Sequence, residues 1–357
     1  MPPMNIRGKK LTLPMDKSCA DPAAGRRRLP CIRGRGLRRQ QTALAILLMG
    51  LVVTGVCTTR TFAQDTPQTP QASPRKIAVY MPWFGDSRHI DVGYSSQDRH
   101  VLRRQIEAAR RAGISAFLVD WYGDRGPFLD KSFKLLQREA RANHFQVALM
   151  YDETEENNGN ATEDAISALN KAYKEYIGPK ARDRDAYLTY NGRPVIVIFP
   201  KRGKTNWNLV REQVNTWPTP PLLFYKDGPP SEFVSAFDGY YAWIHPGDKG
   251  WTADGSDWGK QYLEEFYKNM KSKYPGKIAM GAAWPGFDDS KAPWGLNRHM
   301  DTRCGQTLSD TLELYLRYYD DSAPLPFLLI ETWNDYEEGT AIEQANLLHC
   351  ASADQRK

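Results

Sequence analysis

The chain has 357 residues, of which 41% are hydrophobic and 25% are charged. This balance is typical of a globular protein and excludes collagen-like, coiled-coil and wholly disordered chains. The formal net charge of +6 would suggest nucleic-acid binding, but the excess positive charge lies in the first 63 residues. Residues 1–63 hold 12 Lys and Arg against 2 acidic residues, which leaves 36 basic and 40 acidic residues in the rest of the chain. We therefore expect no phosphate-binding surface, and no nucleic-acid partner, for residues 64–357.

Residues 1–63 form a basic leader with the pattern of a secretory signal peptide. An uncharged run, residues 42–59, follows Arg38 and Arg39, and the sequence Thr61-Phe-Ala63 then places small residues at a cleavage-like site. We expect cleavage near Ala63/Gln64 and a secreted or periplasmic protein. The alternative is an uncleaved leader that anchors the protein in a membrane, but such an anchor needs about 20 apolar residues. Residues 64–75 are rich in Pro, Gln and Thr and are predicted to be a linker.

From Lys76 onward, short apolar runs alternate with amphipathic segments. The apolar runs predict eight strands, at residues 76–83, 115–122, 146–153, 194–199, 221–226, 237–244, 277–284 and 326–333. Helices are predicted from Asp98 to Gly113, up to about Asn143, and over 162–176, 258–273 and 308–319.

This alternation predicts an α/β fold, a single-domain (β/α)8 TIM barrel over residues 76–357. An open, doubly wound sheet is the main rival, but no Gly-x-Gly-x-x-Gly follows the first strand. We expect the last helix to be short or incomplete, because residues 341–357 show no clear apolar face.

Aromatic and acidic residues recur at the ends of six of the predicted strands. In a barrel these ends meet on one face, where active sites lie. Aromatic rings can stack on the C–H faces of a sugar and carboxylates can accept hydrogen bonds from its hydroxyls, so this composition favours a carbohydrate ligand. The predicted binding residues are Tyr80, Trp83, Asp120, Trp121, Tyr122, Tyr151, Glu153, Tyr241, Trp243, Trp284, Trp333 and Asn334. Taken singly, each aromatic residue is equally explained as core filling.

The acidic end of the eighth strand is the strongest candidate for a catalytic segment. Asp335 and Glu338 are three residues apart in a turn-rich segment, so both carboxyl groups can face one cavity. Glycoside cleavage needs two such groups, an acid for the leaving oxygen and a partner that activates the nucleophile. We expect a raised pKa for Glu338, an ionised Asp335, and a solvent-facing Glu337 between them. No His stands at ligand spacing here, and no metal or cofactor is expected.

The run Trp333-Asn-Asp-Tyr-Glu-Glu-Gly-Thr-Ala-Ile-Glu343 resembles the signature of glycoside hydrolase families 71 and 99, which comprise α-1,3-glucanases and endo-α-mannosidases. Residues 80–85, 112–123 and 151–153 support this resemblance, which extends from about Lys76 to Glu343. The paired catalytic acids of these families fall on Asp335 and Glu338. Asp335 stands where the mannosidases carry Glu, so their substrate does not simply transfer.

The resemblance implies a glycoside hydrolase that acts on an α-linked glucan or mannan. From the leader we expect this hydrolase to be exported, and we expect it to be a monomer. Family 71 inverts at the anomeric carbon, whereas family 99 retains by using the 2-hydroxyl of the substrate. The first alternative is a barrel that binds carbohydrate without cleaving it. A metal-dependent polysaccharide deacetylase is a further alternative, but the sequence shows no ligand triad for it.

Cleavage of the leader would remove three of the five cysteines and leave Cys304 and Cys350. In the predicted barrel, Cys304 follows the seventh strand and Cys350 lies just beyond the eighth, so the two are neighbours. We expect them to form a disulfide bond in an oxidising compartment.

Overall fold

The computed structural model describes residues 74–154, 160–202, 204–320 and 325–343. All described residues belong to one unit of the chain, Thr66–Lys357. The expected leader (1–63) and residues 64–73 of the expected linker lie outside the described residues. Within the described part, the helices are all too short or too polar to cross a membrane.

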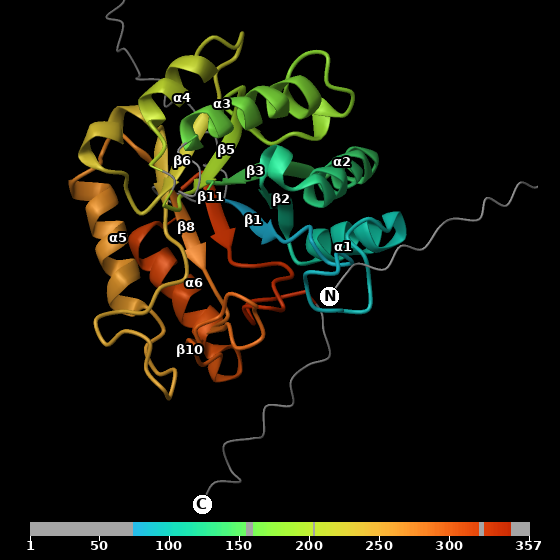
Figure 1. Cartoon of the computed structure of the whole chain (residues 1–357). Coiled ribbons are helices and arrows are strands. Elements are labelled where there is room, and N and C mark those ends of the chain that lie inside the picture. The colour runs from blue at the N-terminus through green and yellow to red at the C-terminus, as the bar shows by residue number, and fades with distance from the viewer. Residues whose placement is uncertain (1–73, 155–159, 203, 321–324, 344–357) are drawn as a thin grey trace, which may run out of the picture. The chain divides into compact units, whose positions relative to one another are not determined.

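Eight parallel strands of the described chain form a closed barrel, with the helices arranged around it (Figure 1). In chain order these strands are β1 (Arg75–Tyr80), β2 (Ile114–Trp121), β3 (Gln146–Asp152), β5 (Arg193–Phe199), β6 (Leu222–Lys226), β7 (Gly239–Tyr241), β8 (Ile278–Ala283) and β11 (Phe327–Ile330). Around the barrel the order is β3-β2-β1-β11-β8-β7-β6-β5, and pairing between β3 and β5 closes the ring. The predicted TIM barrel is therefore confirmed.

The helices present an apolar face to the barrel. They are α1 (Arg99–Arg111), α2 (Pro127–Ala142), α3 (Ala161–Ala172), α4 (Trp207–Val214), α5 (Lys260–Ser272) and α6 (Gln306–Tyr318). Helix α1 shows how the sequence fixes such an element. The Asp98 carboxylate accepts a hydrogen bond from the backbone N–H of His100 and caps the helix. Leu102 and Ile106 are completely buried because they recur at helical spacing.

Three features of the fold differ from the sequence expectations. Helix α4 was not predicted, because it has only 8 residues and a short apolar face. Between β6 and β7 the chain forms a 3-10 helix, Ser231–Ala236. The segment after β8 forms an antiparallel pair, β9 (Phe287–Asp288) with β10 (His299–Met300). The chain after β11 is described to Glu343 without a further helix, and the expected short last helix falls mainly on residues outside the description.

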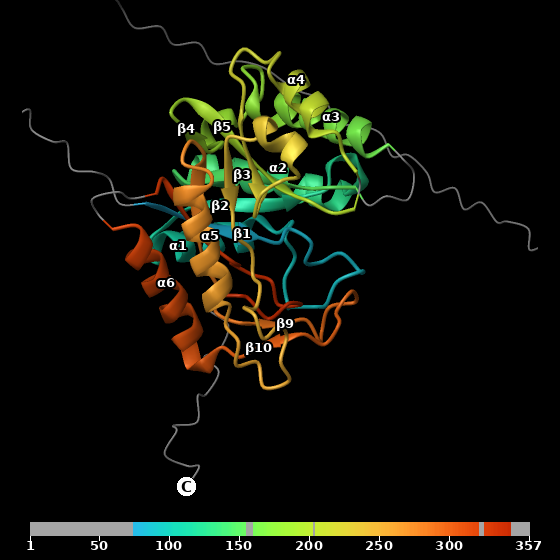
Figure 2. The ribbon, with the colours of Figure 1, turned by 90° about the vertical axis from the view of Figure 1, so that its left-hand side faces the viewer.

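The barrel strands provide a rigid base for the loops that follow them. Strand side chains such as Val79, Leu118 and Ile196 are completely buried. Burial of each such side chain contributes roughly 1.5–3 kcal/mol to the stability of the fold. Figure 2 shows β9 and β10 beyond one end of the barrel, among the loops that extend from the strands. Polar residues in these loops are thereby held in fixed positions relative to one another.

Candidate active site

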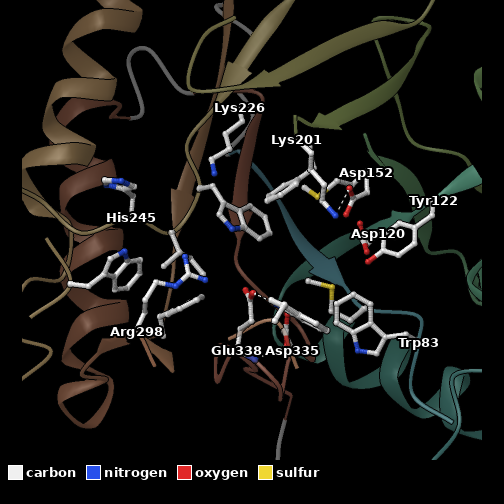
Figure 3. Close-up of a pocket in the computed structure, with 18 residues that line it drawn as sticks. Trp83, Asp120, Tyr122, Asp152, Lys201, Lys226, His245, Arg298, Asp335 and Glu338 are labelled. Carbon is white, nitrogen blue, oxygen red and sulfur yellow. Dashed lines mark hydrogen bonds and ion pairs between the residues drawn. The ribbon is translucent and has the colours of Figure 1, made fainter. Parts of the chain in front are cut away.

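A cavity of about 560 Å³ opens among the segments that follow the barrel strands (Figure 3). This volume lies within the range of small-molecule and cofactor sites. Its lining residues are Met81, Trp83, Asp120, Tyr122, Met150, Asp152, Phe199, Lys201, Lys226, Trp243, Ile244, His245, Trp251, Phe287, Trp294, Arg298, Asp335 and Glu338. The lining combines aromatic rings with four carboxyl groups and three cationic side chains.

The turn after β11 brings Asp335 and Glu338 to the same cavity. The Asp335 Oδ1 atom accepts hydrogen bonds from the backbone N–H groups of Glu337 (3.0 Å) and Glu338 (2.9 Å). The backbone N–H of Asp335 in turn donates to Thr332 Oγ1 at 2.8 Å. Gly339 adopts a φ of +64°, a conformation in which glycine is favoured, directly after Glu338. The Asp335 carboxylate therefore organises the turn that orients Glu338.

Burial raises the pKa of both carboxyl groups. Asp335 is 1% exposed, and its pKa is raised well above the ordinary value by burial and by the neighbouring Glu338 carboxylate. The pKa of Glu338 is raised by burial, against the opposing effects of the Trp294 hydrogen bond and the positive charges of Arg298 and Lys226. The raised pKa of Glu338 agrees with the sequence expectation. The expectation of an ionised Asp335 is not supported, because this side chain is buried more completely than Glu338.

A second polar group faces the cavity from the ends of β2, β3 and β5. Lys201 Nζ lies 2.9 Å from Asp152 Oδ1, and the Tyr122 hydroxyl hydrogen-bonds with Asp120. Burial and the nearby Asp152 carboxylate raise the pKa of Asp120 well above its ordinary value. This wall offers carboxyl, hydroxyl and ammonium groups to a polar ligand.

Aromatic side chains form the mouth of the cavity. The Trp83 ring stacks on His89 at 4.7 Å with an interplanar angle of 5°. Trp294 meets Trp83 edge-on at 5.8 Å, and it is 44% exposed. Trp294 Nε1 donates to Glu338 Oε1 at 2.9 Å. An exposed indole fixed beside a carboxyl group is a suitable platform for a sugar ring.

Of the predicted binding residues, Trp83, Asp120, Tyr122 and Trp243 line the cavity together with the predicted catalytic pair. The other eight lie away from its lining: Tyr80, Trp121, Tyr151, Glu153, Tyr241, Trp284, Trp333 and Asn334. All eight are almost completely buried. Neighbouring side chains of a strand point to opposite faces, so proximity to a strand end does not by itself place a residue in the cavity.

Hydrogen bonds define what several of these eight residues do instead. Trp121 Nε1 donates to Asp130 Oδ1 (3.1 Å), and Trp284 Nε1 donates to the backbone oxygen of Trp258 (3.1 Å). Asn334 pairs with both the backbone N–H and the carbonyl of Met81. These contacts connect helices and loops to the barrel and leave the side chains out of the cavity.

Glu153 and Glu337 are also structural carboxylates. Glu153 accepts hydrogen bonds from the backbone N–H groups of Lys201 (2.6 Å) and Thr205 (3.2 Å) and so fixes the segment after β5. Glu337 was expected to face solvent but is completely buried. It lies 2.9 Å from His89 Nδ1 and accepts a hydrogen bond from the backbone N–H of Ile90 at 3.0 Å. The expectation for Glu337 was wrong because the segment after β1 covers it.

Several cavity residues were missed in the sequence. Lys201 and Lys226 lie at the ends of β5 and β6, the two strand ends that carry no cluster of aromatic and acidic residues. Trp251, Trp294 and Arg298 come from long loops, where no periodicity indicates which side chains turn inward. Within the described residues, no group of three His, Cys, Asp or Glu side chains is arranged to hold a metal ion.

No protein-family model matches the chain, and no curated protein sequence matches it. Among solved structures, the GH99 endo-α-mannosidase of Bacteroides thetaiotaomicron in complex with bis-tris-propane is similar, with a TM-score of 0.58 and 18% identity over 76% of this chain and 87% of that chain. A second structure of this mannosidase gives a TM-score of 0.58 with 17% identity, over 75% of this chain and 87% of that chain. A structure described as a glycoside hydrolase-like protein gives 0.55 with 14% identity, over 78% and 89% of the two chains. These similarities show that the chain shares its barrel fold with these proteins.

Proposed function

We propose that this protein is an exported glycoside hydrolase that cleaves α-linked glycans of the glucan or mannan type. One observation carries the proposal: Asp335, which is buried, and Glu338, which is half-buried, lie on one turn, and both of their carboxyl groups line the same cavity. The similarity of the barrel to glycoside hydrolases supports it. The α-configuration and the choice of substrate rest on the sequence signature at residues 333–343 and are part of the proposal.

The two carboxyl groups can divide the chemistry between them. Glu338 is the general acid that protonates the glycosidic oxygen, and Asp335 is the base that activates either a water molecule or the 2-hydroxyl of the sugar. Each group has one oxygen held in place, Glu338 Oε1 by Trp294 and Asp335 Oδ1 by two backbone N–H groups. Neither Glu338 Oε2 nor Asp335 Oδ2 is held by a hydrogen bond from the described residues, so these oxygens can serve the substrate.

This division needs Glu338 to keep the shared proton and Asp335 to be ionised. The two backbone N–H groups that donate to Asp335 Oδ1 favour its ionised form, although burial opposes it. Repulsion between the two carboxylates makes the pair release its protons in separate steps, so that one proton is retained over a range of pH. A glycosidase needs this state, with one carboxyl protonated and the other ionised. Tyr122, Trp83 and Trp294 provide the surfaces against which sugar rings stack.

The test is a hydrolysis screen of the wild-type protein on α-1,3-glucan and α-mannan, with reducing-end detection and NMR of the first product anomer. Glu338→Gln and Asp335→Asn should each lower turnover by at least about 10²-fold, with an unchanged circular dichroism spectrum. The matched control is Glu313→Gln, which changes an exposed carboxylate on α6 and should leave turnover unchanged.

Full activity of Glu338→Gln on the true substrate would contradict the assigned roles. Binding of an α-glycan without any release of reducing ends would contradict hydrolysis and favour a carbohydrate-binding barrel.

A further inference from the structure

Two cationic side chains flank the proposed acid on one side of the cavity. Lys226 is the last residue of β6, and Arg298 immediately precedes β10. Both line the cavity, and both place positive charge near Glu338. In Figure 3 they lie on one side of Glu338, whereas Asp120 and Tyr122 lie on the other. The cavity therefore has a positive wall and a wall rich in carboxyl groups.

Lys226 makes no direct ion pair within the described chain, although the nearby carboxyl groups of Asp227, Glu331 and Glu338 favour its charged form. Its Nζ lies 5.1 Å from the centroid of the Phe199 ring, but it makes no hydrogen bond and no ion pair with a described residue. Lys201, on the other wall, is instead paired with Asp152 at 2.9 Å. Burial lowers the pKa of Lys226 because water solvates its ammonium group incompletely. An anion entering the cavity would compensate this charge.

Arg298 is held in a fixed orientation beside Lys226. Its Nε donates to Asp289 Oδ2 at 2.7 Å, and Asp289 is completely buried. The guanidinium carbon lies 5.4 Å from the centroid of the Trp251 ring and 5.1 Å from that of Phe287. With Nε engaged and the plane held over these rings, the terminal nitrogens can donate to a ligand. Such a planar fork suits an oxyanion better than it suits a single hydroxyl.

We propose that the cavity binds a glycan with an anionic group, a carboxylate or a sulfate, on a sugar next to the bond that is cleaved. This inference rests on the proposed hydrolase function and names its substrate class. Lys226 and Arg298 would bind the oxyanion on the Glu338 side of the cavity. Whole-molecule attraction does not explain such a preference, because residues 64–357 hold 36 basic and 40 acidic residues.

The experiment compares matched ligands by isothermal titration calorimetry at low ionic strength. The first pair is an α-1,4-linked oligogalacturonate and its carboxyl-reduced counterpart, and the second pair is a dextran sulfate oligosaccharide and unmodified dextran. The proteins are wild type, Lys226→Met, Lys226→Arg and the control Lys268→Met, which changes an exposed lysine on α5. Thermal unfolding of each variant verifies that the fold is intact.

Wild type should bind one of the two anionic probes at least tenfold more tightly than its neutral counterpart. Lys226→Met should lose most of this preference, Lys226→Arg should keep it, and Lys268→Met should match wild type. A preference for oligogalacturonate identifies a carboxylate, and a preference for dextran sulfate identifies a sulfate.

Equal affinity for both members of each pair would overturn the proposal. It would also be overturned if Lys226→Met shifted the pH profile of hydrolysis but kept the anion preference. Lys226 would then act only on the protonation of Glu338 and would not bind the anion. The two proposals fail separately. Hydrolysis of neutral glycans without anion preference contradicts only this inference, and tight anionic binding without hydrolysis contradicts only the enzymatic function.

Discussion

At the level of single residues, the barrel contains a buried carboxyl group that the proposed chemistry does not use. Glu331 follows β11 and is completely buried. Its Oε2 accepts a hydrogen bond from the backbone N–H of Ile244 at 2.7 Å, while Oε1 has no partner among the described residues. Burial raises its pKa well above the ordinary value, and Lys226 acts in the opposite direction. Ionisation of Glu331 should therefore destabilise the folded state.

The sign of this effect follows from proton binding. Because the folded-state pKa is higher than the unfolded-state pKa, the folded protein binds more protons between these two values, and its stability falls as the pH rises through this range. Glu331→Gln keeps an acceptor for Ile244 and cannot ionise. We expect the free energy of unfolding of Glu331→Gln to improve relative to wild type as the pH rises above about 4.3, by about 1.4 kcal/mol for each unit of pKa difference.

Urea unfolding of both proteins from pH 5 to pH 8 measures this effect. Glu313→Gln, an exposed carboxylate on α6, is the control and should show a difference from wild type that does not depend on pH. A constant difference between Glu331→Gln and wild type across the range would contradict the prediction.

At the level of elements, the segment after β1 is held by the segment after β11. Glu337 contacts His89 Nδ1 at 2.9 Å and accepts a hydrogen bond from Ile90 N–H at 3.0 Å. The His89 ring stacks on Trp83, which lines the cavity. Glu337 therefore acts on the cavity through His89 and is a positioning residue.

Glu337→Ala should loosen this segment. The variant removes two contacts and leaves the half-buried Ile90 N–H without its acceptor, which costs at most about 1–3 kcal/mol. We expect faster hydrogen–deuterium exchange in residues 84–97 and a higher KM with a smaller change in kcat. Glu337→Gln is the matched control, because its amide can still accept from Ile90 and donate to a neutral His89. Exchange in residues 84–97 that is equal in Glu337→Ala and wild type would show that Glu337 does not hold the segment.

The same elements show how far the sequence predicts the site. The strands could be located because buried parallel strands are continuous apolar runs. The direction in which an individual side chain points could not be predicted, because it depends on the twist and closure of the barrel. Trp333 illustrates this, since it lies two residues before Asp335 and yet packs against Phe117 in the core, with ring centroids 5.4 Å apart. Lys226 ends a strand that carries no cluster of aromatic or acidic residues, so nothing in the sequence indicated that it lines the cavity.

At the level of the whole molecule, the distribution of charge and cysteine connects the predicted export to the stability of the protein. The basic leader holds 12 of the 48 Lys and Arg residues and three of the five cysteines. Its removal would convert an odd number of cysteines into one pair, Cys304 and Cys350. Cys304 immediately precedes Gly305, the residue that caps α6. Cys350 lies outside the described residues, so the pairing stays a prediction.

We predict that the exported protein begins near Gln64 and contains a bond between Cys304 and Cys350. The separation of these cysteines by 46 residue numbers would give a stabilisation of roughly 3–4 kcal/mol in the chain-entropy model. N-terminal sequencing and thiol titration of unfolded, non-reduced protein from the medium or periplasm test both parts. Reduction should lower the unfolding midpoint of wild type but leave that of Cys304→Ser unchanged. Retention of residues 38–57 would contradict cleavage and favour a membrane anchor, whereas two free thiols in a protein that begins near Gln64 would contradict the disulfide alone.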